Sequence, residues 1–232
     1  MKTKFIVIGL ILVATNVYAQ QSNVLTKTEK KEGWELLFDG KNLNRWKKFN
    51  RGQVSGWKVE DGVLNNSGIG SDHGGDIITK KQYDDFELYM EWKLSKKSNS
   101  GIFIRVQEGI VQKIYQSGPE YQLCDDQNFA KNRDENQFTG SAYAMYTAEN
   151  PLIKPVGEWN SSRIVVKGKK VQHWMNDKKV VEYEIGSDDW KKRKYNSKWK
   201  DEPHYGMADK GHIGLQDHGG LTQFRNIKIR QL

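Results

Sequence analysis

The chain has 232 residues and a formal net charge of +8, and its single cysteine, Cys124, excludes an intramolecular disulfide. Much of the positive excess lies in KKRKYNSKWK at residues 191–200, where Tyr195 and Trp199 interleave the basic residues as in some nucleic-acid-binding patches. The sequence contains no nucleotide-binding glycine loop, zinc-type cysteine set or HExxH motif. We interpret the basic run as a solvated loop and expect no nucleic-acid partner.

The first twenty residues, MKTKFIVIGLILVATNVYAQ, place two lysines before an apolar run, and a Val-Tyr-Ala tripeptide precedes Gln20. This order of charged, apolar and small residues predicts a secretory signal peptide over residues 1–19. The apolar run is shorter than the roughly 20 residues that a transmembrane helix needs. We therefore expect a protein that does not span the membrane and that is exported to the periplasm or the extracellular space.

Residues 20–32 are rich in Gln, Lys, Thr and Glu, and this composition predicts a flexible leader. From Gly33 onward the sequence consists of short strand patterns separated by turn signals. The clearest is DFELYMEWKLS at residues 85–95, in which apolar residues alternate with Glu, Tyr, Glu and Lys. Such alternation predicts a strand with one buried and one solvated face.

The second half of the chain continues the strand pattern. SRIVVKGKKVQHWMNDKKVVEYEI at residues 162–185 indicates successive strands, the last two joined through Asn176-Asp177, and GHIGLQ and FRNIKIRQL indicate two more near the C-terminus. An all-β sandwich or jelly roll is the predicted fold, as a single domain over residues 33–232. The long polar insertions 126–140 and 186–211 are expected to be loops, which either shape a binding site or decorate the surface.

The stretch GPEYQLCDD at residues 118–126 carries the most informative polar pattern. In a strand, Glu120, Gln122 and Cys124 share one face. Retaining glycoside hydrolysis uses two carboxyl groups about 5–5.5 Å apart, but the second and third positions on this face are not acids. Glu120 is therefore a candidate for a lone base, with a solvated sheet carboxylate as the alternative.

Several phrases of the sequence go beyond a generic β pattern. They are, in order, GWELLFDGKNLNRW (33–46), GWKVEDGVL (56–64), GGDIITKKQYDDFELYMEWKLS (74–95), NSGIFIRV (99–106), GEWNSSRIVVKGKKVQHWMND (157–177) and GHIGLQDHGG (211–220) with the C-terminal FRNIKIRQL. Together they resemble the bacterial family known as the 3-keto-disaccharide hydrolase domain, also described as a 3-keto-glucoside 1,2-lyase and 3-keto-2-hydroxy-glucal hydratase domain. The resemblance implies a concanavalin-A-like jelly-roll β-sandwich, secretion by glycan-degrading bacteria, and chemistry on oxidised sugars.

The implied elimination needs a base for the proton on carbon 2, which the neighbouring ketone acidifies, an electrophile for the enolate oxygen, and an acid for the leaving group. We assign the catalytic roles to Glu120, to His218, which two glycines follow, and to Arg105, whose guanidinium offers a fork of donors. An ordinary turn histidine and a structural salt bridge are the alternatives for the last two residues. The residues predicted to bind substrate are Asp76, Glu91, Asn99, Ser100, Gln122 and Gln216.

A divalent metal remains an open alternative. Glu120 and His218, with Asp76 or Asp125, would make an oxygen-rich set able to hold such an ion against a ketone oxygen. Their dispersed spacing carries almost no specificity, so no cofactor is assigned. His73 is a further histidine to consider, whereas the alternation around His173 predicts that its side chain faces the core.

These observations lead to one hypothesis and two alternatives. The hypothesis is an exported enzyme that cleaves 3-keto-glycosides by elimination, hydration or both, which together amount to hydrolysis of the glycosidic bond. The alternatives are a non-catalytic carbohydrate-binding jelly roll and an ordinary glycoside hydrolase acting on unoxidised sugars. The sequence leaves open the glycosidic linkage, the leaving group and the oligomeric state.

Overall fold

The computed structural model describes residues 21–66, 68–69 and 75–232. The predicted signal peptide and His73 fall outside the described residues. Within them, no helix is both long enough and apolar enough to cross a membrane.

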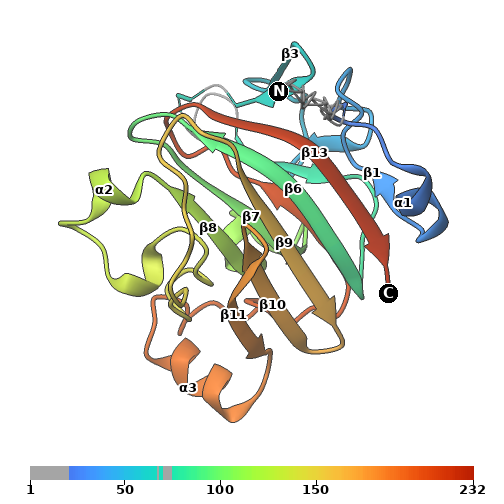
Figure 1. Cartoon of the computed structure of the whole chain (residues 1–232). Helices are drawn as coiled ribbons and strands as arrows, with labels where there is room; N and C mark the ends of the chain where they lie inside the picture. The colour runs from blue at the N-terminus through green and yellow to red at the C-terminus, as the bar shows by residue number, and fades with distance from the viewer. Residues whose placement is uncertain (1–20, 67, 70–74) are drawn as a thin grey trace, which may run out of the picture.

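Two antiparallel β-sheets pack face to face (Figure 1). Among the described residues, the larger sheet has the order β11-β10-β9-β6-β13-β4-β3, with β1 also paired to β13, and the smaller has the order β2-β5-β12-β7-β8. The larger sheet contains β1 (Glu35–Leu36), β3 (Lys58–Glu60), β4 (Val63–Asn65), β6 (Phe86–Leu94), β9 (Asn160–Lys167), β10 (Lys170–Met175), β11 (Lys178–Glu184) and β13 (Thr222–Gln231). The smaller contains β2 (Trp46–Lys48), β5 (Ile77–Thr79), β7 (Asn99–Val106), β8 (Glu120–Cys124) and β12 (His212–Leu215). The predicted all-β, concanavalin-A-like jelly-roll sandwich is confirmed.

In the described part of the chain, helical structure is confined to short segments at the edges of the sandwich. They are α1 (Lys27–Lys31), η1 (Ile114–Gln116), α2 (Asp126–Phe129), η2 (Glu135–Gln137) and α3 (Asp188–Tyr195). The insertion 186–211, which we expected to be a loop, therefore begins with a helix. In Figure 1, α3 lies beyond the ends of β10 and β11.

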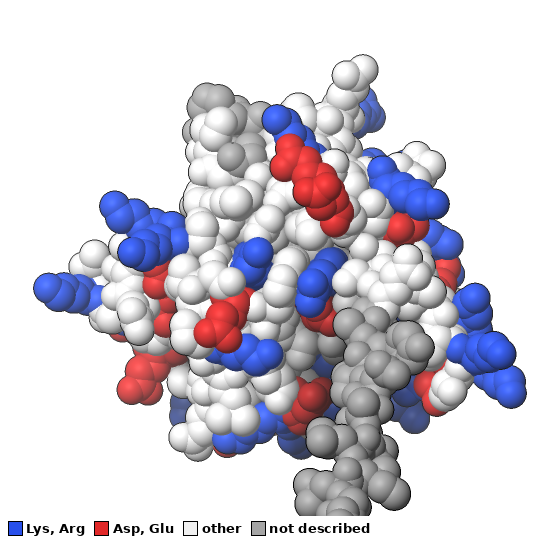
Figure 2. Space-filling view, turned by 45° about the horizontal axis from the view of Figure 1, so that its top comes forward, with Lys and Arg blue, Asp and Glu red and all other residues white. Residues whose placement is uncertain are grey.

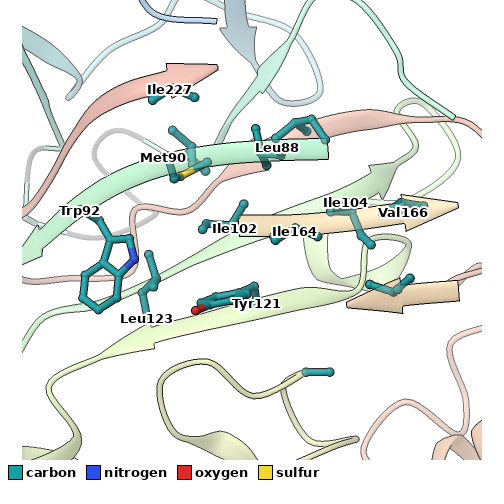
Figure 3. Close-up of a cluster of buried hydrophobic side chains, with 14 of the residues drawn as sticks. Leu88, Met90, Trp92, Ile102, Ile104, Tyr121, Leu123, Ile164, Val166 and Ile227 are labelled. Carbon is teal, nitrogen blue, oxygen red and sulfur yellow. The ribbon is translucent and has the colours of Figure 1, made fainter. Parts of the chain in front are cut away.

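The core lies between the sheets and follows the alternation read from the sequence. The inward side chains of β6 are buried, and those of Leu88, Met90 and Trp92 meet residues of β7 and β8 from the facing sheet (Figure 3). The Trp92 indole donates a hydrogen bond to Ser162 Oγ on the adjacent strand β9 at 2.8 Å, which satisfies its one polar group. The turn at Asn176-Asp177 is also as expected, with both residues at positive φ.

The segment 21–32 is attached to the sandwich, in contrast to the flexible leader that its composition suggested. Asn23 is buried, its backbone N–H donates to Asn226 Oδ1 of β13 at 2.5 Å, and its own Oδ1 accepts from the Asn226 backbone N–H at 2.8 Å. Glu29 of α1 forms an ion pair with Lys228 on the same strand. Specific side-chain pairing with β13 therefore outweighs the polar composition of this segment.

Basic and acidic side chains are interspersed over the face of the molecule seen in Figure 2, with no continuous basic patch on it. Several of the basic residues on the larger sheet are paired, as in the contacts of Arg225 with Glu91 and of Arg230 with Glu87. Such interspersed charge gives no extended basic footprint for a nucleic-acid backbone on this face.

Candidate active site

A cavity of about 310 Å³ lies on the face of the smaller sheet that points away from the core. Its floor comes from four neighbouring strands or the residues beside them, and its walls come from the loops that cover this face. The floor residues are Asp76, Asn99, Glu120, Gln122, Gln216 and His218. The wall residues are Lys113, Tyr115, Arg133, Tyr143, Lys198 and Trp199. The lining thus combines two carboxyl groups, three cations, three aromatic rings, three amides and an imidazole.

Glu120 begins β8 and is the most buried acid of the cavity, with only 4% of its surface exposed. Its strand pairs with β7 so that Gly101 lies beside its side chain, and a Cβ atom built at Gly101 would be 2.1 Å from Glu120 Oε1. The glycine therefore provides the space for the carboxyl group. Burial, opposed by Lys198 and Arg133 and reinforced by the charge of Asp76, raises the pKa of Glu120 to about 8.

Polar side chains connect Glu120 to the mouth of the cavity. In the amide orientation that satisfies both of its ends, Gln122 donates to Glu120 Oε1 at 2.9 Å and accepts from Arg133 Nη1 at 2.7 Å. In this orientation the Gln122 oxygen faces Asn99 Oδ1 at 2.9 Å, a contact that becomes a hydrogen bond when the Asn99 amide is turned as well, and the other end of the Asn99 amide lies 3.1 Å from His218 Nδ1. One continuous polar chain therefore fixes the carboxyl group and the imidazole relative to each other.

His218 is exposed at the mouth of the cavity, in the turn after β12. Partial desolvation of its ring, together with the positive charges of Arg133 and Lys198, lowers its pKa. A lowered pKa leaves the imidazole neutral near pH 7, so that one ring nitrogen accepts a hydrogen bond and the other donates one.

Asp76 precedes β5 on the opposite side of the floor. One of its carboxyl oxygens accepts a hydrogen bond from the backbone N–H of Asp217 at 3.2 Å. Burial, with a further contribution from the charge of Asp217, raises its pKa to about 7, although this hydrogen bond and Lys113 act in the opposite direction. A carboxyl group with a pKa in this range can act as an acid near neutral pH.

Lys198 and Trp199 bring the basic run 191–200 into the site, which corrects its interpretation as a purely solvated loop. The Lys198 ammonium lies over the rings of Trp199, Tyr143 and Tyr115, at 4.6, 4.7 and 5.9 Å from their centroids. The Trp199 indole is buried and donates to the Tyr143 carbonyl oxygen at 3.0 Å. Partial burial and the neighbouring Arg133 lower the pKa of Lys198, whereas Glu120 raises it. Tyr195, on the other hand, is as exposed as expected.

Six residues singled out from the sequence lie together on the cavity floor, and three others lie elsewhere. Ser100 does not line the cavity: its buried hydroxyl donates to the Gln216 carbonyl oxygen at 2.7 Å, from beneath the floor. Glu91 lies on the outer face of the larger sheet, where it accepts from Arg225 Nε at 2.6 Å and from Asn226 at 2.8 Å.

Arg105 also lies away from the cavity, because a β-bulge interrupts the alternation of β7. Gly214 pairs with Phe103 and His212 with Val106, so β7 has one more residue than β12 between these pairs. Arg105 lies in this bulge and has a left-handed backbone conformation, with a φ of +54°. Its side chain is 1% exposed and donates to the Gly168 carbonyl oxygen in the β9–β10 turn, at 2.5 Å. Arg105, which the sequence led us to place in the catalytic site, is therefore not part of the cavity lining.

The remaining metal-ligand candidates do not converge. Asp125 caps α2 and accepts from the backbone N–H of Lys97 at 2.8 Å, outside the cavity. His173 is buried in the core, as predicted, with Nδ1 at 3.0 Å from the Gly140 carbonyl oxygen. No group of three or more His, Cys, Asp or Glu side chains is arranged to ligate a metal ion within the part of the chain that the structure describes.

The three cationic residues of the wall were not predicted from the sequence to line the site. Lys113, Arg133 and Lys198 all come from loops, and nothing in their local sequence marks them as facing the same cavity. The only usable signal was the interleaving of Tyr and Trp with the basic residues of 191–200, which is unusual for a fully solvated loop.

The sequence of this chain is similar to a known protein family and to a named relative. Residues 33–230 match a family described as the 3-keto-alpha-glucoside-1,2-lyase-like domain. The chain is 36% identical over 229 residues to a 3-keto-disaccharide hydrolase of Bacteroides thetaiotaomicron, a match covering 87% of this chain and 79% of that protein.

Two crystal structures of Parabacteroides distasonis proteins, each proposed to be a glycosyl hydrolase, are also similar. One shares 42% identity with a TM-score of 0.85, over 91% of this chain and 100% of the other. The second shares 29% identity with a TM-score of 0.69, over 86% and 99%. The resemblance seen in the sequence is confirmed, and the chain belongs to the 3-keto-alpha-glucoside-1,2-lyase-like domain family.

Proposed function

We propose that the protein is an exported enzyme that cleaves 3-keto-glycosides by base-initiated elimination, followed by hydration of the unsaturated sugar. Membership of the family and the name of the Bacteroides thetaiotaomicron relative support this substrate class. The single observation that carries the mechanism is the position of Glu120. This buried carboxyl group of raised pKa lines the same cavity as two cations, Lys198 and Arg133, whose charges act on it.

In the first step, the Glu120 carboxylate removes the proton from carbon 2 of the sugar. The electron pair moves into the C2–C3 bond, and the ketone oxygen becomes an enolate oxygen. Lys198 and Arg133 are the groups available to stabilise that negative charge, the role we first assigned to Arg105. A raised pKa makes Glu120 a stronger base once it is ionised, which suits abstraction of a weakly acidic C–H proton.

In the second step, the enolate collapses to a C1=C2 double bond and expels the group at carbon 1. The leaving oxygen takes a proton from Asp76, whose raised pKa keeps part of the population protonated at neutral pH, and the neutral His218 can donate a hydrogen bond to this oxygen. Hydration reverses the pattern: water adds to carbon 1 and gives a proton to the Asp76 carboxylate, and Glu120 returns a proton to carbon 2. The sum of the two steps is hydrolysis, with atoms and charges balanced.

One observation favours a second candidate, ordinary hydrolysis of unoxidised glycosides. Asp76 and Glu120 line one cavity, and paired carboxyl groups are the machinery of most glycosidases. Against it stands the cationic wall of Lys113, Arg133 and Lys198, which suits an anionic transition state better than an oxocarbenium-like one.

The test is a comparison of substrates with the purified protein. We expect a 3-keto-disaccharide to be converted to free sugar, with a transient 2-hydroxy-glucal-type intermediate, and the corresponding unoxidised disaccharide to remain intact. Cleavage of both sugars at similar rates would favour the ordinary hydrolase. Binding of either sugar in calorimetry without any product would favour the non-catalytic binding module.

A further inference from the structure

Five aromatic rings form one continuous stack that ends at the cavity wall. Tyr146, Tyr183 and Trp190 contact one another at its far end, with the Tyr146 and Trp190 centroids 6.2 Å apart, and Tyr205 and Trp199 follow in that order toward the cavity. Successive ring centroids are 5.0, 5.3, 5.6 and 4.7 Å apart, with interplanar angles of 10°, 22°, 9° and 10°. These spacings are those of favourable offset-stacked pairs. The last ring, Trp199, lines the cavity.

The stack joins the rigid sandwich to the loop that carries the wall. Tyr183 belongs to β11, whereas Tyr205 and Trp199 belong to the segment that follows α3. Trp190 is the one buried side chain of α3 and lies at the centre of the stack. The loop approaches its indole closely at Gly206, where a Cβ atom would be 2.8 Å from Trp190 Cζ2.

The position of Lys198 depends on the last ring of this stack. Its ammonium lies 4.6 Å from the centroid of Trp199, the adjacent residue, and 4.7 Å from that of Tyr143. Because Lys198 is otherwise a flexible side chain of an exposed residue, these rings define where its charge lies. A shift of the Trp199 indole would therefore move the ammonium away from the cavity.

Tyr205 contributes its ring and not its hydroxyl. It is fully buried, and its hydroxyl oxygen has no hydrogen-bond partner among the described residues. A buried hydroxyl without a partner costs stability, and a phenylalanine would avoid that cost. The position therefore uses the aromatic face, as expected for a member of a stack.

We propose that Trp190 and Tyr205 are positioning residues, which hold the Trp199 indole and the Lys198 ammonium at the cavity wall without touching the substrate. The kinetic consequence of this inference rests on the proposed function, but the placement of the ammonium does not. Through the stacked rings, the fixed position of β11 constrains α3 and the loop after it. The position of the Lys198 ammonium, which stabilises the enolate, is constrained in turn. Loss of a central ring is expected to release Lys198 while Glu120 stays in place.

The experiment uses the full chain and three variants: Trp190→Leu, which breaks the stack, Trp190→Phe, which keeps a ring, and Tyr205→Phe, which removes only the hydroxyl. The first measurement is competitive acetylation of lysines as a function of pH, read residue by residue by peptide mass spectrometry. In the wild type, Lys198 is expected to titrate below the ordinary 10.5, because the site partly desolvates it and Arg133 is nearby. In Trp190→Leu its titration should move up toward the ordinary value, because the ammonium leaves the site that desolvates it, whereas both Phe variants should resemble the wild type.

The second measurement is the separation of kcat from KM on a 3-keto-glycoside. An interaction made only in the transition state lowers kcat and kcat/KM together. We expect Trp190→Leu to lose at least about tenfold in kcat with KM within about threefold, and Trp190→Phe to recover most of that loss. Should Trp190→Leu not fold, Tyr205→Leu breaks the stack one ring nearer the cavity, with the same expectations.

A folded Trp190→Leu or Tyr205→Leu variant with an unchanged Lys198 titration and unchanged kcat would overturn the inference, because the stack would then serve stability alone. If the wild type does not turn over keto-glycosides, the proposed function fails. The acetylation profile still decides whether the stack positions Lys198, so the two failures are distinguishable.

Discussion

The carboxyl group of Glu120 occupies the space that a side chain at position 101 would need. A Cβ atom at Gly101 would lie 2.1 Å from Glu120 Oε1 and 2.8 Å from its Cγ and Cδ atoms. Because Gly101 has no side chain, the buried Glu120 carboxyl group of β8 can lie over the backbone of the neighbouring strand β7. This relationship is visible only once β7 and β8 are paired in register.

Gly101→Ala is expected to displace the Glu120 carboxyl group from the cavity floor. Activity on a 3-keto-glycoside should fall by about a hundredfold or more, because a misplaced base loses its reach to the substrate proton. Overpacking should also lower the free energy of unfolding by about 1–3 kcal/mol. Kinetics and urea unfolding measure the two effects, and a variant with wild-type kcat/KM would show that the carboxyl position is not needed.

Glu120→Gln keeps the shape of the side chain but removes the base. We expect kcat to fall by about 10²–10⁴-fold while the protein stays folded, which circular dichroism can verify. Glu91→Gln is the matched control, because Glu91 is a strand carboxylate outside the cavity. Its activity should stay within about threefold of the wild type. Equal activity of both variants would exclude Glu120 as the base.

The raised pKa of Glu120 predicts how stability depends on pH. Its pKa is about 8 in the folded protein and near 4.5 when solvated, so the folded state favours the protonated form. The contribution of Glu120 to the free energy of unfolding is therefore fully present below about pH 4.5 and is lost as the pH rises through about 8. As the pH rises from 5 to 9, the free energy of unfolding should fall less in Glu120→Gln than in the wild type, with a difference on the order of a few kcal/mol. Parallel pH profiles from urea unfolding would contradict this environment for Glu120.

Lys198→Gln removes the cation that lies over three aromatic rings at the cavity wall. If this ammonium stabilises the enolate, kcat should fall by about 10²–10³-fold, as for loss of one oxyanion-stabilising group. Lys200→Gln, two residues further along the same exposed segment, is the matched control and should behave like the wild type. Loss of activity in both variants would indicate a general effect of charge in this loop.

Arg105 is expected to serve stability. Its guanidinium bridges from β7 to the β9–β10 turn through the Gly168 carbonyl oxygen, outside the cavity. Arg105→Met should lower the free energy of unfolding by about 1–3 kcal/mol, because the Gly168 oxygen loses its donor. The kcat of the folded fraction should remain within about threefold of the wild type, and a large loss without destabilisation would restore a catalytic role.

The sequence was a good guide wherever local periodicity determines the outcome. The alternation in β6 defined which side chains enter the core, and the alternation in β8 placed Glu120 and Gln122 together on the cavity floor. It failed for Arg105 because one additional residue in β7, invisible in the local pattern, turns that side chain to the other side.

The walls of the cavity could not be predicted for a different reason. Arg133 and Lys198 lie in irregular segments, whose paths are determined by tertiary contacts such as the aromatic stack and have no sequence period. The leader was similarly misjudged from composition, since the reciprocal bonds between Asn23 and Asn226 join residues about 200 positions apart in the chain. Long-range pairing of this kind requires the folded structure.

In the proposed mechanism, cleavage begins with removal of the proton on carbon 2 by Glu120. This step is tested by single-turnover kinetics of a 3-keto-glycoside that carries deuterium at carbon 2, compared with the same glycoside that carries hydrogen there. We expect slower release of the leaving group from the deuterated sugar, because its C–D bond breaks in the first step, and no release from either sugar by Glu120→Gln. Equal rates of release from the two sugars would show that this bond is not broken before cleavage and would indicate direct hydrolysis.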